Sequence, residues 1–172
     1  MSGLRIGSGF DSHRLADGRP LMLGGIEIPS DRGLLGHSDG DCVCHAICDA
    51  LLGAAAAGDM GTHFPSSEER WRDVSGRKFL TEVRGMVEGR GFRIENVDVT
   101  AIAQAPRLAP HVAAMRTALA ACLGLDEERV SVKVKSADHM GAVGREEGIA
   151  ALATVLLRAP DETGEPDQRE QG

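Results

Sequence analysis

Aromatic residues are scarce in this sequence: they make up 3% of its 172 residues, and tyrosine is absent. Surfaces that hold single-stranded nucleic acid stack its bases on aromatic side chains, so this scarcity argues against such a surface. The net charge of -7 argues equally against a protein that binds phosphate backbones. We therefore exclude nucleic acid from the expected partners.

Long apolar runs and paired cysteines are also missing. No stretch approaches the roughly 20 apolar residues of a membrane-spanning helix, and the first residues lack a signal-peptide pattern. The four cysteines form no C-x-x-C pair, and Cys42, Cys44 and Cys48 fall within one predicted helix. We expect reduced cysteines that serve packing, no membrane association and a cytoplasmic location.

Apolar residues make up 42% of the chain, which is enough for a buried core, and the length is that of one domain. We expect this single domain to cover residues 1–158. Residues 160–172 contain no apolar residue and carry a net charge of -4. This composition predicts a disordered acidic tail over residues 159–172.

Strand and helix patterns alternate along the chain. Strands are expected at 4–10, 92–104, 130–136 and 149–158, and a hairpin at 21–29 turns at Gly24-Gly25. Helices are expected at 42–57, at 73–91 and from Pro110 to about Gly124, and loops at 30–35, 62–71 and 136–148. This order predicts an α+β fold, a two-layer α/β sandwich with a ferredoxin-like sheet and helices on one face. The other sheet face would stay exposed, so we expect it to mediate oligomerisation.

Residues 34–61 gather polar groups beside a helix of small and apolar residues. Asp41 follows Gly40 at the position of a helix N-cap. Asp41, His45 and Asp49 are four residues apart, so they share one stripe of this helix. Burying carboxylates and imidazoles without partners costs free energy. The stripe therefore predicts a binding site.

Asp11 and His13 stand two residues apart at the end of the first strand, so their side chains project the same way. Together with His45 they form a set of two imidazoles and one carboxylate, which is typical of catalytic zinc with an open fourth position. On spacing alone, a turn at Asp11–His13 and a satisfied core histidine at position 45 explain these residues better than a metal site does. A metal-dependent phosphohydrolase and a non-catalytic module with structural zinc are further interpretations of the same three ligands.

Asp138 lies in a glycine-rich loop directly after a strand that carries Lys133 and Lys135. A loop carboxylate beside these lysines and Ser136 suits Mg²⁺ held against phosphate oxygens. An ordinary turn aspartate and solvated lysines explain the same residues. Arg145 fits a phosphate contact or an ion pair with a neighbouring glutamate.

Read in order, these features resemble one family. The matching segments are RIGSGFDSHRL at 5–15, LMLGGIEIP at 21–29, GLLGHSDGD…H…DALLGAAAAGDMG at 33–61, HFP at 63–65, NVDVTAIAQAPRLAPH at 96–111 and GREEGIA at 144–150. They resemble the 2-C-methyl-D-erythritol 2,4-cyclodiphosphate synthase family of the non-mevalonate isoprenoid pathway, and the resemblance covers residues 5–158.

The resemblance implies a role for particular residues of this chain. The implied zinc ligands are Asp11, His13 and His45. The implied contacts to the methylerythritol phosphate are His37, Ser38, Asp41 and Phe64, and those to the ribose and diphosphate are Asp59 and Gly61. The implied cytosine pocket contains Ala103, Pro106, Arg107 and Leu108. The implied diphosphate-binding segment, contributed by a neighbouring subunit, is Val134, Lys135 and Ser136. Of these we count Lys135 and Ser136 as catalytic, together with Asp138.

Asp138 stands where the family usually has a glutamate that binds a second divalent ion, Mg²⁺ or Mn²⁺. The resemblance further implies a homotrimer with sites between subunits and an isoprenoid diphosphate in its central channel near Arg145, where Ala142 replaces a phenylalanine of some members.

The implied reaction is an intramolecular phosphoryl transfer. The substrate would be 4-diphosphocytidyl-2-C-methyl-D-erythritol 2-phosphate, whose 2-phosphate attacks the β-phosphorus and expels cytidine monophosphate. Because nucleophile and electrophile belong to one molecule, no side-chain nucleophile is needed. The chief alternative is the phosphohydrolase, which would use the same zinc site to activate water.

Overall fold

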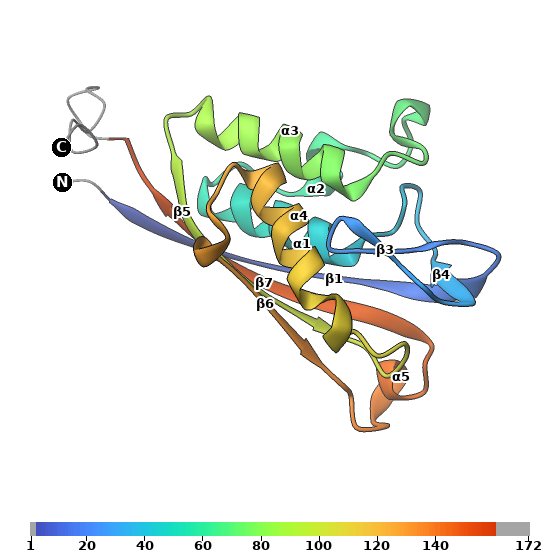
Figure 1. Cartoon of the computed structure of the whole chain (residues 1–172). Coiled ribbons are helices and arrows are strands. Elements are labelled where there is room, and N and C mark those ends of the chain that lie inside the picture. The colour runs from blue at the N-terminus through green and yellow to red at the C-terminus, as the bar shows by residue number, and fades with distance from the viewer. Residues whose placement is uncertain (1–2, 161–172) are drawn as a thin grey trace.

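The computed structural model describes residues 3–160 and has an α+β architecture (Figure 1). Five strands form one sheet in the order β4-β1-β7-β5-β6. They are β1 (Leu4–Asp17), β4 (Arg32–Leu34), β5 (Arg93–Ile102), β6 (Val130–Lys135) and β7 (Gly148–Arg158). The separate hairpin consists of β2 (Leu21–Leu23) and β3 (Ile26–Ile28).

Three longer helices lie together on one side of the sheet (Figure 1). They are α1 (Cys42–Ala54), α3 (Gly76–Glu88) and α4 (Val112–Leu123). The shorter pieces are α2 (Met60–His63), α5 (Gly141–Gly144) and the 3₁₀ turns at Glu69–Trp71, Ala109–His111 and Glu127–Arg129. The prediction of two layers with helices on one face is confirmed.

The strand order differs from the predicted ferredoxin-like sheet. A ferredoxin-like chain runs β-α-β-β-α-β, whereas here the helix α4 connects the parallel neighbours β5 and β6. The last strand, β7, then enters between β1 and β5 and pairs antiparallel with both. The ferredoxin-like prediction was wrong because this insertion depends on pairing between the two ends of the chain.

Most predicted elements have the predicted type. The strand at 149–158 is confirmed as β7, and the strand at 4–10 continues to Asp17. All three predicted loops contain parts of short elements. β4 lies within 30–35, the end of α2 and a 3₁₀ turn lie within 62–71, and α5 lies within 136–148. The predicted tail lies almost wholly outside the described residues. No described helix has the length and the hydropathy that crossing a lipid bilayer requires.

The helix α1 is the centre of the core. Eleven of its residues are buried, and the four cysteines of the chain are free and buried, as expected of packing residues. Burial raises the pKa of the Cys44 and Cys48 thiols well above the ordinary value, which keeps them in the neutral form.

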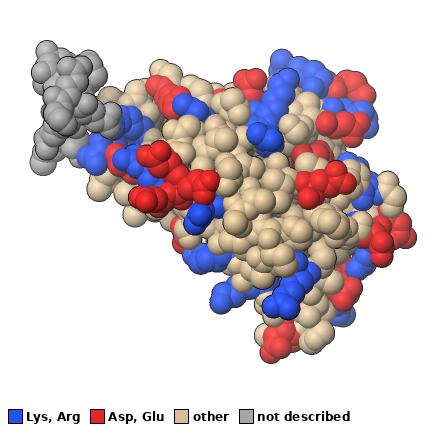
Figure 2. All heavy atoms as spheres, in the orientation of Figure 1, with Lys and Arg blue, Asp and Glu red and all other residues tan. Residues whose placement is uncertain are grey.

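The outer face of the sheet is uncovered. Side chains alternate along β1, so that the odd-numbered residues from Gly7 face α1 and the even-numbered ones face outward. Four large apolar side chains are exposed on this outer face: Leu4 at 58%, Ile6 at 74%, Phe10 at 61% and Leu152 at 49%. Figure 2 shows Lys and Arg mixed with Asp and Glu around the margin of one view, with no single basic patch.

Candidate metal centre and substrate pockets

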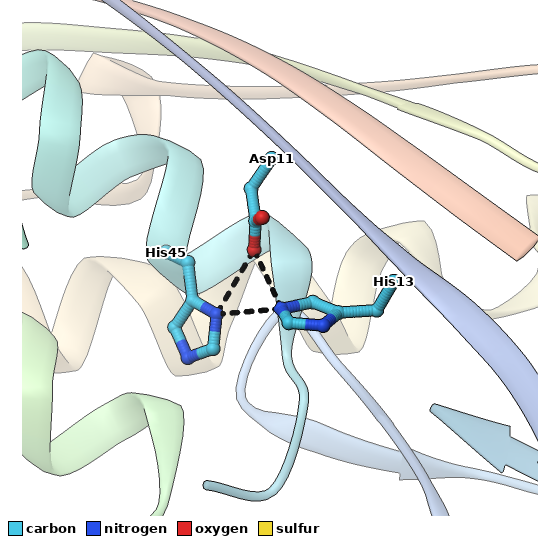
Figure 3. Close-up of side chains that lie close together, drawn as sticks. All are labelled: Asp11, His13 and His45. Atoms are coloured by element: carbon cyan, nitrogen blue, oxygen red, sulfur yellow. Dashed lines mark hydrogen bonds and ion pairs between the residues drawn. The ribbon is translucent and has the colours of Figure 1, made fainter. Parts of the chain in front are cut away.

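Asp11, His13 and His45 converge on one point (Figure 3). Asp11 Oδ2 lies 2.9 Å from His13 Nε2 and 3.0 Å from His45 Nδ1. The two imidazole nitrogens are 3.2 Å apart. These three residues form the group of potential metal ligands found among residues 3–160. The predicted juxtaposition of a strand end and a helical histidine is therefore present.

Glycines on β1 bring the strand close enough to α1 for this meeting. A β-carbon at Gly7 would lie 1.9 Å from the carbonyl oxygen of Ala50, and one at Gly9 would lie 2.1 Å from that of Ala46. Two residues of a strand advance about 6.6 Å, close to the roughly 6 Å of four helical residues. The next inward residue, Asp11, therefore falls one turn nearer the start of α1 than Ala46. Helical side chains lean towards the N-terminus of their helix, so the His45 side chain extends into this turn and meets Asp11.

Hydrogen bonds among the three side chains cannot satisfy all of their polar atoms at once. If both imidazoles donate to the same Asp11 oxygen, two N–H groups face each other across 3.2 Å. Burial alone would raise the pKa of Asp11, but hydrogen bonds from His13 and His45 outweigh it and hold the pKa well below its ordinary value. Burial lowers the pKa of His13, but the Asp11 carboxylate leaves it above its ordinary value. Both shifts follow from the contacts between the Asp11 carboxylate and the imidazoles.

The loop before α1 holds the far side of His45. Ser38 Oγ lies 3.2 Å from His45 Nε2, which fixes the ring orientation. Arg19 donates from its guanidinium to the carbonyl oxygens of Gly36 and Ser38, at 3.3 and 2.9 Å. Sequence reasoning missed Arg19, because its partners are 17 and 19 residues away.

Asp41 has a different role from the predicted substrate contact. It is fully buried and caps α1 by accepting hydrogen bonds from the backbone N–H groups of Val43 and Cys44. It also accepts from the N–H groups of Gly24 and Gly25 in the hairpin turn, at 2.9 and 2.6 Å. Because the side chain is fully buried and both oxygens already accept from backbone donors, we correct the prediction of a substrate contact to a structural role.

A pocket of about 200 Å³ opens beside the metal ligands. His13, His37, Ser38, His45 and Phe64 line it, together with Met60, Ser66, Trp71 and Phe79. The ring centroid of Phe64 lies 4.9 Å from those of both Trp71 and Phe79. The expected neighbourhood of His37, Ser38 and Phe64 is therefore present, whereas the aromatic wall of Trp71 and Phe79 was not predicted.

Asp49, Asp59 and Gly61 lie around the start of α2. Asp49 Oδ1 accepts a hydrogen bond from Met60 N at 2.8 Å, which ties α1 to α2. Asp59 caps α2 by accepting from the N and Oγ1 of Thr62, and these hydrogen bonds lower the pKa of Asp59. Gly61 is exposed in the same turn.

A second pocket, of about 310 Å³, lies where β5 and β6 end. The seven predicted residues that line it are Ala103, Pro106, Arg107, Leu108, Val134, Lys135 and Ser136. Gln104 and Ala109 complete it, and a hydrogen bond from Ala103 N to Lys135 O closes its base. Two segments to which the resemblance gives separate roles thus form one pocket within this chain.

Within one chain, Lys135 of the second pocket lies far from the metal ligands. The register places Lys135 level with Ile102, Ala150 and Ser12, three strands across from β1. Three strand spacings of about 4.8 Å amount to roughly 14 Å. Lys135 faces the outer side of the sheet, whereas Asp11 and His13 face α1. One chain therefore does not bring its own Lys135 to its own metal ligands.

Asp138 and Arg145 lie in the loop between β6 and β7, outside the Asp11–His13–His45 cluster. Asp138 is exposed and has a φ of +49°. Arg145 donates to Glu147 Oε1 at 2.6 Å, the second of the two partners considered from the sequence. Lys133 pairs with Asp98 across the parallel strands.

Known proteins resemble this chain in both sequence and fold over most of its length. A model described as the YgbB family matches residues 4–158. A 2-C-methyl-D-erythritol 2,4-cyclodiphosphate synthase from Laribacter hongkongensis is 57% identical over 91% of this chain and 96% of its own length. The bifunctional IspDF structure from Campylobacter jejuni has a TM-score of 0.90 at 37% identity, over 95% of this chain and 44% of that longer chain. An IspF structure from Plasmodium falciparum, described as a CDP complex, has a TM-score of 0.81 at 32% identity, over 94% of this chain and 99% of its own.

Proposed function

The chain belongs to the YgbB family and has the activity of a 2-C-methyl-D-erythritol 2,4-cyclodiphosphate synthase in isoprenoid biosynthesis, and on this premise we propose how its residues carry the reaction. The substrate is 4-diphosphocytidyl-2-C-methyl-D-erythritol 2-phosphate. Its 2-phosphate oxygen forms a bond to the β-phosphorus, the bond from that phosphorus to the bridging oxygen breaks, and cytidine monophosphate leaves with the electron pair. The product is an eight-membered cyclic diphosphate.

Asp11, His13 and His45 would hold a zinc ion. A tetrahedral ion with bonds of about 2.0 Å places its ligand atoms about 3.3 Å apart, close to the 2.9, 3.0 and 3.2 Å between these three ligand atoms. The donor set of two imidazoles and one carboxylate is one that catalytic zinc accepts with its fourth position open. Bound divalent cations supply positive charge that orients and polarises the diphosphate.

The surrounding side chains would bind and orient the methylerythritol phosphate. Among the residues that line the pocket, His37 and Ser38 offer hydrogen-bonding groups and Phe64 offers an apolar surface. Holding the 2-phosphate against the diphosphate is the larger part of catalysis here, because the reacting groups share one molecule. Asp59 and Gly61 at the start of α2 would meet the ribose and the diphosphate.

A small-molecule nucleotide ligand is supported by the CDP bound in the Plasmodium relative. The cytosine would enter the pocket lined by Ala103, Pro106, Arg107 and Leu108, and Lys135 and Ser136 would meet the diphosphate. Asp138 would hold a second divalent cation, Mg²⁺ or Mn²⁺, whose oxygen preference suits a carboxylate and phosphates.

We further propose a homotrimer in which each site uses two copies of the chain. The wide separation of Lys135 from the metal ligands within one chain supports this arrangement, because both must reach one diphosphate. The exposed apolar face formed by Leu4, Ile6, Phe10 and Leu152 supports it as well, since such patches on soluble proteins usually mark an interface.

The observation that carries the zinc proposal is the convergence of three ligand atoms within 3.2 Å of one another. Phosphorus NMR of the substrate with enzyme, before and after a chelator, tests it. We expect the cyclic diphosphate and cytidine monophosphate to form without inorganic phosphate, and chelation to stop both. Release of inorganic phosphate would instead favour the metal-dependent phosphohydrolase.

A further inference from the structure

Gln104 joins two segments to which the proposed function gives different tasks. It lines the nucleotide pocket between Ala103 and Pro106. Its side chain also reaches the turn that carries Asp138, 35 residues away from it along the chain. Gln104 Oε1 accepts a hydrogen bond from His139 N at 3.1 Å, and Gln104 Nε2 lies 3.4 Å from His139 Nε2.

The turn needs such a support because its backbone is unusual. Asp138 and His139 have φ values of +49° and +59°, and neither is glycine. Consecutive left-handed residues are rare outside glycine because the β-carbon crowds the carbonyl oxygen. Such conformations persist where the surroundings hold them, and they gather at functional sites. The hydrogen bond that Gln104 Oε1 accepts from His139 N stabilises the turn in this conformation.

We propose that Gln104 is a positioning residue that couples the nucleotide pocket to the cation-binding turn. By accepting from His139 N, it keeps the turn in the conformation that presents the Asp138 carboxylate. A nucleotide that orders the segment from Ala103 to Leu108 therefore orders Gln104 and the turn. The inference rests on the proposed role of Asp138 in holding a divalent cation.

The coupling is reciprocal by thermodynamic linkage. If the nucleotide tightens cation binding through Gln104, the cation tightens nucleotide binding by the same factor. A purely structural Gln104 would change the stability of the loop and leave this factor unchanged. The coupling factor is therefore the quantity that separates the two roles.

The test measures Mn²⁺ bound to the full chain by water proton relaxation enhancement, with and without CDP. The variants are Gln104→Ala, Gln104→Glu and His139→Ala. Gln104→Glu keeps an oxygen that accepts from His139 N, and His139→Ala keeps the backbone N–H. We expect CDP to tighten Mn²⁺ binding in the wild type, and Gln104→Ala to reduce this effect about fivefold, the size of one net hydrogen bond. The other two variants should stay within about twofold of the wild type.

A double variant gives a rescue. Glycine accepts a left-handed backbone without steric cost, so Gln104→Ala combined with His139→Gly should recover part of the coupling. An unchanged coupling factor in Gln104→Ala would overturn the proposal, as would equal losses in all three single variants. Circular dichroism of each variant identifies misfolding. If Gln104→Ala misfolds, Gln104→Met replaces it, because methionine keeps the length of the side chain and removes the oxygen that accepts from His139 N.

This experiment is separable from the test of the proposed function. If the wild-type enzyme failed to form the cyclic diphosphate, the proposed reaction would fall while the Mn²⁺ and CDP coupling could still be measured. If cyclisation occurred but Gln104→Ala kept full coupling, the role of Gln104 alone would fall.

Discussion

The two halves of the proposed site are held in very different ways. Asp11, His13 and His45 project from a strand and a helix that pack through glycines in the core, and His45 is only 8% exposed. Asp138 and His139 are exposed, left-handed residues of a connecting loop. The difference teaches that one chain pre-forms the cluster of potential metal ligands, the zinc half of the proposed site. In our proposal the nucleotide half is completed by a ligand and a second copy.

The largest effect should follow from removing a ligand of the pre-formed half. We expect His45→Ala to lose zinc and to lower the rate of cyclisation about a thousandfold, since metal charge supplies several kcal/mol of transition-state stabilisation. Elemental analysis of the purified variant and a rate measurement check this. A variant that retained the zinc content of the wild type would contradict the ligand assignment.

The next effect tests whether the zinc half depends on core packing. Asp41→Ala should destabilise the protein by about 3 kcal/mol, because the cap of α1 is lost and the N–H groups of Gly24 and Gly25 remain buried without an acceptor. Thermal unfolding measures it, and Asp59→Ala is the matched control. Asp59 caps the four-residue α2 from an exposed position, so its removal should change stability little.

The same contrast explains which parts of the site could be predicted from the sequence. The pairing of Asp11 with His13 was predictable because the two residues share strand parity, and the inward position of His45 because it lies on a helical stripe. Their meeting joins residues 32 and 34 positions apart, and it was implied by the family resemblance rather than by a local pattern. The cap at Asp41 was predictable from a local pattern. Its contacts to Gly24 and Gly25 were not, because they join a hairpin and a helix that no local pattern relates.

Long-range pairing accounts for the other failures. The position of β7 between β1 and β5 follows from the pairing of residue 4 with residue 158, which no window of sequence contains. The aromatic wall of Trp71 and Phe79 brings together a loop and a helix. The support of the Asp138 turn by Gln104 likewise appears only once β5 and β6 are neighbours.

A third prediction concerns the copy that completes the site. Phe10→Asp should weaken assembly at least about a hundredfold, because an unpaired carboxylate would be buried against another copy. Activity should fall with it, since Lys135 and the zinc ligands must then meet across a broken interface. Sedimentation measures the assembly, and Thr81→Asp on the exposed side of α3 is the control. A fully active monomer of the Phe10 variant would refute the shared site.

The fourth prediction separates the two halves directly. Asp138→Asn should raise the Mg²⁺ or Mn²⁺ concentration needed for half-maximal activity about tenfold, because one charged ligand is lost. Its zinc content should equal that of the wild type, since Asp138 is no part of the zinc cluster. An unchanged divalent-cation titration would contradict the role of Asp138 as a ligand of the second cation. Loss of zinc from the variant would contradict the independence of the two halves.

The smallest effect should come from Arg19, which supports the zinc half through the loop before α1. Arg19 donates to the carbonyl oxygens on both sides of His37, and Ser38 in turn orients His45. Removing a residue that hydrogen-bonds directly to a metal ligand typically lowers the affinity for the metal by about tenfold to a hundredfold. Because Arg19 acts through one further residue, we expect Arg19→Ala to speed zinc loss to a chelator by only about fivefold.

Arg19→Lys keeps the charge without the planar guanidinium group. It should resemble Arg19→Ala if the geometry of the hydrogen bonds matters, and the wild type if charge alone matters. A chelator time course distinguishes these outcomes, and unchanged zinc release in both variants would show that the triad needs no support from the loop before α1.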